Sequence, residues 1–391
     1  MKKNAYALVL CSLLLSFSSC KNDNKLESTE CEQTIQIDKP DGTSIVDLID
    51  KESVFLVNPE KSDESLLGLV SRVEVYKDRI YAKDMLVSKG IYIFNMDGKF
   101  VRKPTSIGQG PEEYTTLSDF KIDKKNDRLI INDRYNKTVS FLDLEGNFLN
   151  RKKVKFSGEY FAPLSNGEFA FFSDVSSVDG ENTVIVTDNE LKENRSYYPV
   201  NQNHNFILGV PTRLTLTDEG TILFSAPYDS KIYEITHNGF RPKYCFNCTF
   251  GKELPNDVAT TLSPQNRSKT LNSEGYIVYR GDLINCKNSL CFSFTYGNGS
   301  SFNDQYLFFF DKESKKGKTV YKYSKEVLAG LLFNEPKGSY EDFFISVVGP
   351  EKLNAIDIES LDFPESFKTA LRSVKEEDNP LLIFFKLKKI E

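Results

Sequence analysis

Residues 74–100 are EVYKDRIYAKDMLVSKGIYIFNMDGKF, and residues 121–148 are KIDKKNDRLIINDRYNKTVSFLDLEGNF. Both stretches contain, in the same order, a strand, a turn, a strand that ends in Asp, a loop, a strand, an acidic-Gly turn and a last strand. Gly98 and Gly146 stand 48 positions apart, and Asp84 and Asp133 stand 49 apart. An internal repeat of this length predicts a four-stranded unit. Asp-Gly and Glu-Gly supply the positive φ that a tight hairpin needs.

Weaker copies of this unit follow along the chain. Their strand-like segments are 168–172, 183–187, 221–225, 231–236, 275–280, 282–286, 290–296, 305–310 and 343–348. The last unit ends with residues 381–387 and is one strand short, and residues 53–57 could supply that strand. A unit of about 40–50 residues is the size of a propeller blade, and a ring lets every blade bury both faces. The pattern predicts an all-β, six-bladed β-propeller whose N-terminal strand closes the last blade. Seven blades or a β-sandwich are the alternatives.

Segments with a helical period are scarce, and the best one comes late in the chain. The pattern predicts a helix after Asp362, with Asp362 as its N-cap and Pro364 in its first turn. Its buried face would comprise Phe367, Leu371 and Val374. A shorter helix is expected over residues 350–355. The propeller should therefore carry one or two short C-terminal helices.

The start of the chain combines basic residues, a short apolar run and a cysteine. Lys2 and Lys3 precede the apolar residues 5–15, and two serines precede Cys20. This arrangement resembles a bacterial lipoprotein signal, in which the cysteine is acylated and becomes the first residue. The run is too short to span a bilayer. We expect residues 1–19 to be the signal peptide, Cys20 to be lipidated, residues 20–32 to form a flexible tether and residues 33–391 to form the propeller. The alternative is a plain secretory peptide cut near Ser19.

Composition restricts the classes of function. The chain has 391 residues, a net charge of -6 and 39 % hydrophobic residues, which indicates a globular body with ample core. An acidic chain without a basic stripe is not expected to bind nucleic acid. The chain has two histidines, His204 and His237, which cannot form a three-histidine metal site.

Four further stretches carry a family resemblance. They are VFLV at 54–57 followed by ESLLG at 64–68, SIGQGPEEY at 106–114, YDSKIYEI at 228–235 and DNPLLIFFKL at 378–387. These stretches resemble the six-bladed β-propeller lipoproteins of Bacteroidetes, distant relatives of NHL-repeat propellers, and they span nearly the whole mature chain. Glu112 departs from the family pattern, which commonly has Gly there. The resemblance implies the propeller fold. Together with the signal, it implies an outer-membrane lipoprotein that faces the periplasm or the cell surface.

One face of the ring is expected to hold the binding site. By strand parity, the loop at 106–114 lies on the same face as the loops that follow Asp84 and Asp133, and Asp229 is expected in an equivalent later loop. Loops on one face of a rigid ring are the usual place for a ligand. The candidate ligand-binding residues are Asp84, Gly110, Glu112, Glu113, Tyr114, Asp133, Arg134 and Asp229. Gly108 and Gly110 would permit unusual backbone angles. The alternative is that this loop staples two blades, with a carboxylate that caps backbone N–H groups.

The acidic residues of these loops also raise the question of a metal. Asp84, Asp133 and Asp229 could offer oxygen ligands to calcium. The chain has no calcium-loop spacing, and Asp at a strand end most often closes a turn through the backbone. No metal site or cofactor is therefore predicted, with calcium as the alternative. No nucleophile–base pair is evident, so no catalytic residue is predicted.

The cysteines allow several arrangements. Cys286 and Cys291 could face each other across a hairpin and form a disulfide, which exported proteins favour. Cys245 and Cys248 stand three apart on a predicted strand and point to opposite faces. Simple buried thiols and a zinc site are the alternatives. Cys31 lies in the predicted tether and is expected to be unpaired.

The leading hypothesis for function is a non-catalytic binding module, anchored to the membrane by its lipid, that presents the loop face to a peptide, glycan or protein. The alternative is a calcium-dependent lactonase or lyase that uses carboxylates in the central channel. Carboxylates that converge on one point in the channel would favour the enzyme, whereas scattered acids that cap turns would favour the binding module. A third hypothesis is a structural scaffold with a broad apolar patch on the outside of the ring.

Overall fold

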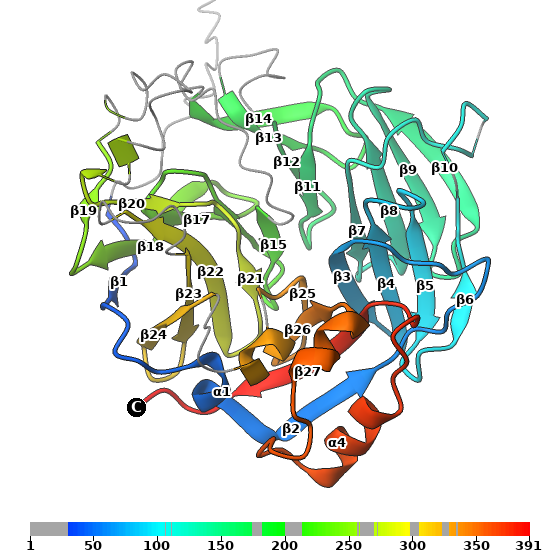
Figure 1. Cartoon of the computed structure of the whole chain (residues 1–391). Helices are drawn as coiled ribbons and strands as arrows, with labels where there is room; N and C mark the ends of the chain where they lie inside the picture. The colour runs from blue at the N-terminus through cyan, green and yellow to red at the C-terminus, as the bar shows by residue number, and fades with distance from the viewer. Residues whose placement is uncertain are drawn as a thin grey trace, which may run out of the picture.

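A computed structural model describes residues 30–105, 107–110, 112–173, 182–199, 213–255, 258, 270–271, 273–297, 305–322, 328–333 and 335–391. Within these residues the strands form six sheets, arranged as blades around a common axis (Figure 1). The signal peptide, Cys20 and His204 lie outside the described residues.

The first three blades are regular four-stranded sheets in chain order. Blade 1 contains β3 (Val70–Tyr76), β4 (Arg79–Asp84), β5 (Ile91–Asn95) and β6 (Phe100–Arg102). Blade 2 contains β7 (Asp119–Asp123), β8 (Arg128–Asp133), β9 (Thr138–Asp143) and β10 (Phe148–Lys153). Blade 3 contains β11 (Tyr160–Pro163), β12 (Phe169–Phe172), β13 (Asn182–Thr187) and β14 (Glu193–Pro199).

The last three blades depart from this pattern. Blade 4 contains β15 (Leu214–Leu216), β16 (Ile222–Ser225), β17 (Lys231–Ile235) and β18 (Phe240–Cys248), and gains β1 (Gln33–Ile37) as a parallel fifth strand. Blade 5 contains β19 (Lys252–Glu253), β20 (Tyr276–Tyr279), β21 (Ile284–Asn285), β22 (Ser289–Tyr296), β23 (Gln305–Asp311) and β24 (Lys316–Tyr321). Blade 6 contains β25 (Gly338–Tyr340), β26 (Phe343–Val348), β27 (Leu381–Leu387) and β2 (Ile49–Val57). The parallel strand β1 has no precedent in the repeat and was not predicted.

The ring is closed as the sequence predicts. Contacts run around the axis from β3 through β7, β11, β15, β21 and β25 and back to β3. The N-terminal strand β2 pairs antiparallel with β27, with Val57 opposite Leu382 and Leu56 opposite Ile383. Figure 1 shows β2 and β27 side by side although they stand at opposite ends of the chain. The two ends of the propeller therefore share one blade.

The side chain of Asn379 reinforces this closure with hydrogen bonds between the two ends of the propeller. Its side chain is 1 % exposed. It accepts a hydrogen bond from the Leu67 N–H (2.9 Å) and donates to the carbonyls of Glu60 (2.9 Å) and Ser65 (2.8 Å). The segment that follows β2 is thus bonded to the segment that precedes β27. These are two of the stretches that carry the family resemblance.

Hydrophobic clusters fill the spaces between neighbouring blades. One cluster joins Val57, Leu382 and Phe384 of blade 6 to Val73 and Phe94 of blade 1. Comparable clusters join the other neighbours around the ring. Each sheet therefore buries both of its faces, which a single blade cannot do. The phenylalanine run 308–310 belongs to two of these clusters, and all three side chains are fully buried.

Short helices cover the contact between blades 5 and 6. They are α1 (Ile45–Leu48), η2 (Leu328–Phe333), η3 (Pro350–Ala355) and α4 (Glu365–Arg372). Phe367 and Leu371 are buried as predicted. The predicted N-cap is wrong, because α4 begins later: Pro364 occupies the cap position, and Asp362 is exposed and bonded to Lys51. The helices α1 and η2 were not predicted, since four- to six-residue helices leave almost no periodic signal.

The disulfide prediction is wrong. Cys286 and Cys291 are free, buried thiols, and the disulfide joins Cys31 to Cys245 instead. Strand register explains why Cys286 and Cys291 are not bonded to each other. Cys291 lies opposite Ile284, and Cys286 lies in the turn that follows β21. The pairing of β1 with β18 explains the disulfide between Cys31 and Cys245, since it brings the N-terminal segment to the outer edge of blade 4. Cys31 is therefore fixed to the propeller rather than free in a tether.

Replacement of Asn379 tests the closure contact. In Asn379→Asp two donated hydrogen bonds become contacts between oxygens at a buried position, so the free energy of unfolding should fall by about 3–5 kcal/mol. Urea unfolding followed by circular dichroism measures this change. Asn238→Asp, at an exposed position between β17 and β18, is the matched control and should be nearly neutral. An Asn379→Asp variant as stable as the control would show that the contact does not hold the ring.

Candidate functional site

Asp84 and Asp133 occupy equivalent positions at the ends of β4 and β8. Asp84 is buried and accepts hydrogen bonds from the backbone N–H groups of Gly68 (3.1 Å), Leu69 (2.9 Å) and Ser88 (2.6 Å). Asp133 is also buried and accepts from the N–H of Thr115 (2.7 Å). Each carboxylate therefore fixes the loop that leads into the first strand of its own blade.

The other candidate acid, Asp229, has a different environment. It lies in the loop between β16 and β17, which is the equivalent loop of blade 4, as predicted. Its carboxylate accepts hydrogen bonds from the hydroxyl groups of Tyr198 and Tyr233, each at 2.8 Å. Burial raises the pKa of Asp229, against the effect of these two hydrogen bonds. Because Tyr198 belongs to blade 3, this carboxylate ties two blades together.

The described residues of the loop at 106–114 bond to one another and to blade 1. Glu113 accepts a hydrogen bond from the Gly110 N–H (2.8 Å), and Tyr114 is buried with its hydroxyl donated to the Lys89 carbonyl (3.2 Å). Neither Gly108 nor Gly110 has a positive φ. Gly108 is needed for another reason, since a Cβ there would lie 1.8 Å from the Glu113 carboxylate. Glu112 is exposed, and its carbonyl accepts from Thr105 (2.7 Å). Ser106 and Pro111 lie outside the described residues.

A cavity of about 500 Å³ opens at this face of the ring, over blades 1 to 3 and the start of blade 6. We call it the mouth cavity. Its lining residues are Leu69, Val70, Ser71, Arg72, Lys83, Met85, Thr116, Leu117, Ser118, Asp119, Arg134, Tyr135, Glu159, Tyr160 and Lys337. Of the predicted candidates only Arg134 is among them. Its guanidinium forms an ion pair with Glu159 (3.1 Å) and lies over the ring of Tyr135 (4.8 Å to the centroid).

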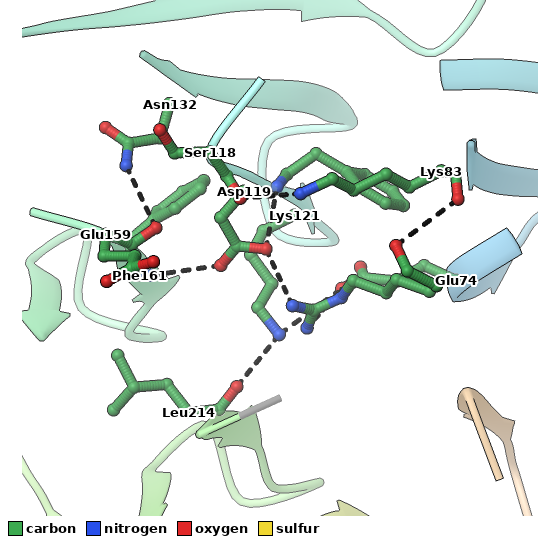
Figure 2. Close-up of polar contacts among 12 residues, drawn as sticks. Glu74, Lys83, Ser118, Asp119, Lys121, Asn132, Glu159, Phe161 and Leu214 are labelled. Atoms are coloured by element: carbon green, nitrogen blue, oxygen red, sulfur yellow. Dashed lines mark hydrogen bonds and ion pairs between the residues drawn. The ribbon is translucent and has the colours of Figure 1, made fainter. Parts of the chain in front are cut away.

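Buried charged side chains are among those that line the mouth cavity, and Figure 2 shows their polar contacts. Arg72 of β3 forms ion pairs with Asp119 of β7 (2.8 Å) and with Glu74 (3.1 Å). Lys121 of β7 lies 3.4 Å from Glu74 and donates to the Leu214 carbonyl of blade 4 (3.0 Å). Burial raises the pKa of Asp119 and of Glu74, and the Arg72 guanidinium opposes both shifts. We call these four side chains the axial charge network.

The axial charge network also connects neighbouring blades. The second oxygen of Asp119 accepts from the Phe161 N–H of blade 3 (3.1 Å), as Figure 2 shows. A smaller cavity of about 90 Å³ lies on the other side, lined in part by Glu74, Lys121 and Pro163. Arg72 lines both cavities. The network therefore separates the mouth cavity from the rest of the channel.

Lys83 of β4, like the axial charge network, was not predicted from the sequence. Its ammonium donates to the Ser118 carbonyl (2.6 Å) and lines the mouth cavity. Burial lowers the pKa of Lys83 to about 8, which outweighs the opposing effect of Asp119. The sequence held a signal for the axial charge network, though not for Lys83. Charged residues alternate along the innermost strands, in Arg72-Val73-Glu74 and in Asp119-Phe120-Lys121, where a blade should otherwise be apolar.

The described residues contain no group of three His, Cys, Asp or Glu side chains placed to hold a metal ion. In the same part of the chain, no helix has both the length and the apolar character needed to cross a membrane.

One known protein family covers nearly the whole chain. The profile of a family described as a domain of unknown function, DUF4934, matches residues 32–386. The chain belongs to the DUF4934 family. No curated protein matches the chain. The relationship to NHL-repeat lipoproteins stays a prediction.

Two solved structures share the fold. A protein of Bacteroides fragilis described as exported has a TM-score of 0.78 at 19% identity, over 91% of this chain and 100% of its own. A member of the DUF4221 family from Bacteroides vulgatus has a TM-score of 0.51 at 10% identity, over 87% and 99%. The virginiamycin B lyase of Staphylococcus aureus gives only 0.38 at 11% identity, over 70% and 75%, which is too remote to support an assignment of activity. The neighbours therefore establish the propeller fold.

The pKa of Lys83 leads to a dependence of stability on pH. Below pH 8 the folded and unfolded chains both hold the proton, and burial of the charge weakens the fold. Between about pH 8 and the ordinary value of 10.5, the unfolded chain holds a proton that the folded chain has lost. Stability relative to Lys83→Met should therefore rise with pH across this window. Urea unfolding of the wild type and of Lys83→Met at pH 7, 9 and 10 measures this difference in the free energy of unfolding. Lys39→Met, at an exposed position, is the control. A difference that stays flat or falls would contradict the burial of this ammonium.

Proposed function

We propose that this chain is a lipid-anchored, extracytoplasmic propeller that binds a peptide, glycan or protein ligand at the mouth cavity without catalysing a reaction. The observation that carries the proposal is the mouth cavity itself. It is a hollow of about 500 Å³, it lies on the loop face, and exposed apolar side chains form its rim. Its volume lies within the range of about 300–1,000 Å³ that is usual for ligand sites.

Exposed apolar side chains gather on this face. Among the described residues, nine large hydrophobic side chains are exposed. Seven of them lie in loops at this end of blades 1 and 2: Leu66, Leu69, Met85, Leu86, Val87, Ile107 and Tyr135. Leu69, Met85 and Tyr135 line the mouth cavity. Exposed apolar side chains that gather on one face are typical of an interaction site. The scaffold hypothesis expects the patch on the outer side of the ring, so this placement favours ligand binding.

The acids of the loop face support binding over catalysis. A calcium-dependent lactonase or lyase requires several oxygen ligands that converge on one ion. Asp84 and Asp133 instead accept backbone N–H groups, and Asp229 accepts two tyrosine hydroxyl groups. These are the scattered, structural acids that the binding hypothesis expects.

Two observations support a location outside the cytoplasm. The disulfide between Cys31 and Cys245 is of a kind that forms in oxidising compartments. The similar protein of Bacteroides fragilis is described as exported. With the lipoprotein-like signal that ends at Cys20, these observations support a lipoprotein of the outer membrane that faces the periplasm or the cell surface.

A ligand screen with a rim variant tests the binding site. Peptides, oligosaccharides and calcium are added to the purified protein, and the melting temperature is recorded. We expect a peptide or oligosaccharide to raise the melting temperature of the wild type and to lose this effect in Met85→Asp. Leu149→Asp is the control, since Met85 and Leu149 are both 51 % exposed and Leu149 lies on the outer strand β10.

Two results would count against the proposal. A ligand shift that persists in Met85→Asp would place the site elsewhere. A shift produced by calcium and reversed by a chelator would support the enzyme alternative.

Partition between detergent and water tests the anchor. The wild type should enter the detergent phase, and Cys20→Ala should remain in the aqueous phase because it lacks the acylated thiol. A wild-type protein found in the aqueous phase would contradict lipidation at Cys20.

A further inference from the structure

The mouth cavity separates apolar and charged side chains. Leu69, Met85 and Tyr135 are exposed at its rim. The charged side chains lie deeper, where Arg72 and Asp119 are buried in the axial charge network. A ligand that fills this cavity would therefore meet apolar surface first and charge at its inner end.

The cations that line the cavity differ in their partners. Arg72 is paired with Asp119 and Glu74, and Arg134 is paired with Glu159. Lys337 is paired with Glu335 at 3.2 Å. Each of these three cations therefore forms at least one ion pair with a carboxylate of the protein, although Glu335 also pairs with Lys322 at 2.7 Å.

Lys83 is the exception within the described part of the chain. None of the described carboxylates lies within 4.0 Å of its ammonium, which donates to the neutral carbonyl of Ser118. An ammonium has three N–H donors, so the Ser118 carbonyl leaves donors for another acceptor. A lysine ammonium in an apolar hollow that forms no direct ion pair with a described carboxylate favours a ligand with one negative charge.

We infer that the mouth cavity binds an apolar group that carries one carboxylate, with the carboxylate on Lys83 and the apolar body against Leu69, Met85 and Tyr135. This inference rests on the proposed function and adds the chemistry of the ligand. A phosphate monoester fits less well, because it carries close to two charges near neutral pH and only one is available to balance it.

Two sources could supply this chemistry: an aliphatic acid, or the C-terminus of a peptide that ends in an apolar residue. Isothermal titration calorimetry on the purified protein distinguishes them. The first arm compares decanoate with decanol, which has no charge. The second arm compares a tetrapeptide that ends in Leu with its C-terminal amide. In either arm the acid should bind about 10- to 100-fold more tightly than its neutral analogue, since a charge-assisted hydrogen bond is lost.

Variants locate the carboxylate contact. Lys83→Met should lose the preference for the acid, with binding weakened by about 10- to 100-fold. It should melt no lower than the wild type, because it removes a buried charge that no described carboxylate pairs. Lys39→Met, at an exposed position, should bind as the wild type does.

The outcomes separate this inference from the proposed function. Equal binding of acid and neutral analogue, undiminished binding by Lys83→Met, or no binding of either acid at 10 mM would overturn the carboxylate inference. If a neutral ligand binds and Met85→Asp abolishes that binding, the mouth cavity remains the binding site and only the inferred chemistry fails. If acid binding depends on Lys83 but not on Met85, the inferred position of the apolar body is wrong.

Discussion

The pairing of β2 with β27 is the constraint on which the rest of the structure depends. A blade exposes two apolar faces, and only a closed ring covers both faces of every blade. The cluster of Val57 and Leu382 with Val73 is the last contact in that ring, and it exists only if the N-terminal strand lies beside the C-terminal one. Asn379 adds hydrogen bonds that fix the chain on either side of the pair. Closure then sets the positions of the innermost strands and brings the loops of blades 1 to 3 to one mouth.

The same constraint determines which residues remain for function. Innermost strands lie close together at the axis, and their side chains face one another. The axial charge network fills this space with ion pairs, and the loop carboxylates hold the backbone that leads into each blade. Most polar groups of the loop face are thereby used by the scaffold. Among the described residues, the apolar rim and the ammonium of Lys83 are the features on which the proposed binding site rests.

The fold could be predicted because its signal is repeated and local. The spacing of Gly98 and Gly146 predicted the four-stranded blade. The missing strand after Leu387 predicted closure by residues near Val54. The candidate site was predicted less well. Asp84 and Asp133 lie on the expected face, yet they serve the backbone, because a sequence shows where an Asp stands but not which N–H groups surround it. Lys83 and the disulfide of Cys31 were missed, since both depend on neighbours distant in sequence. For Cys31 and Cys245 that separation is 214 residues.

Hydrogen exchange of the closing strands tests ring closure most directly. If β2 completes blade 6, amides of residues 49–57 and 381–387 that are bonded between the strands should exchange only through global unfolding, and with the same free energy. Mass spectrometry of peptides from these two segments, at a series of urea concentrations, measures both values in one experiment. The structure predicts that the two values agree and converge with the free energy of global unfolding. Fast exchange in residues 49–57 while residues 381–387 remain protected would contradict a ring closed by its N-terminal strand.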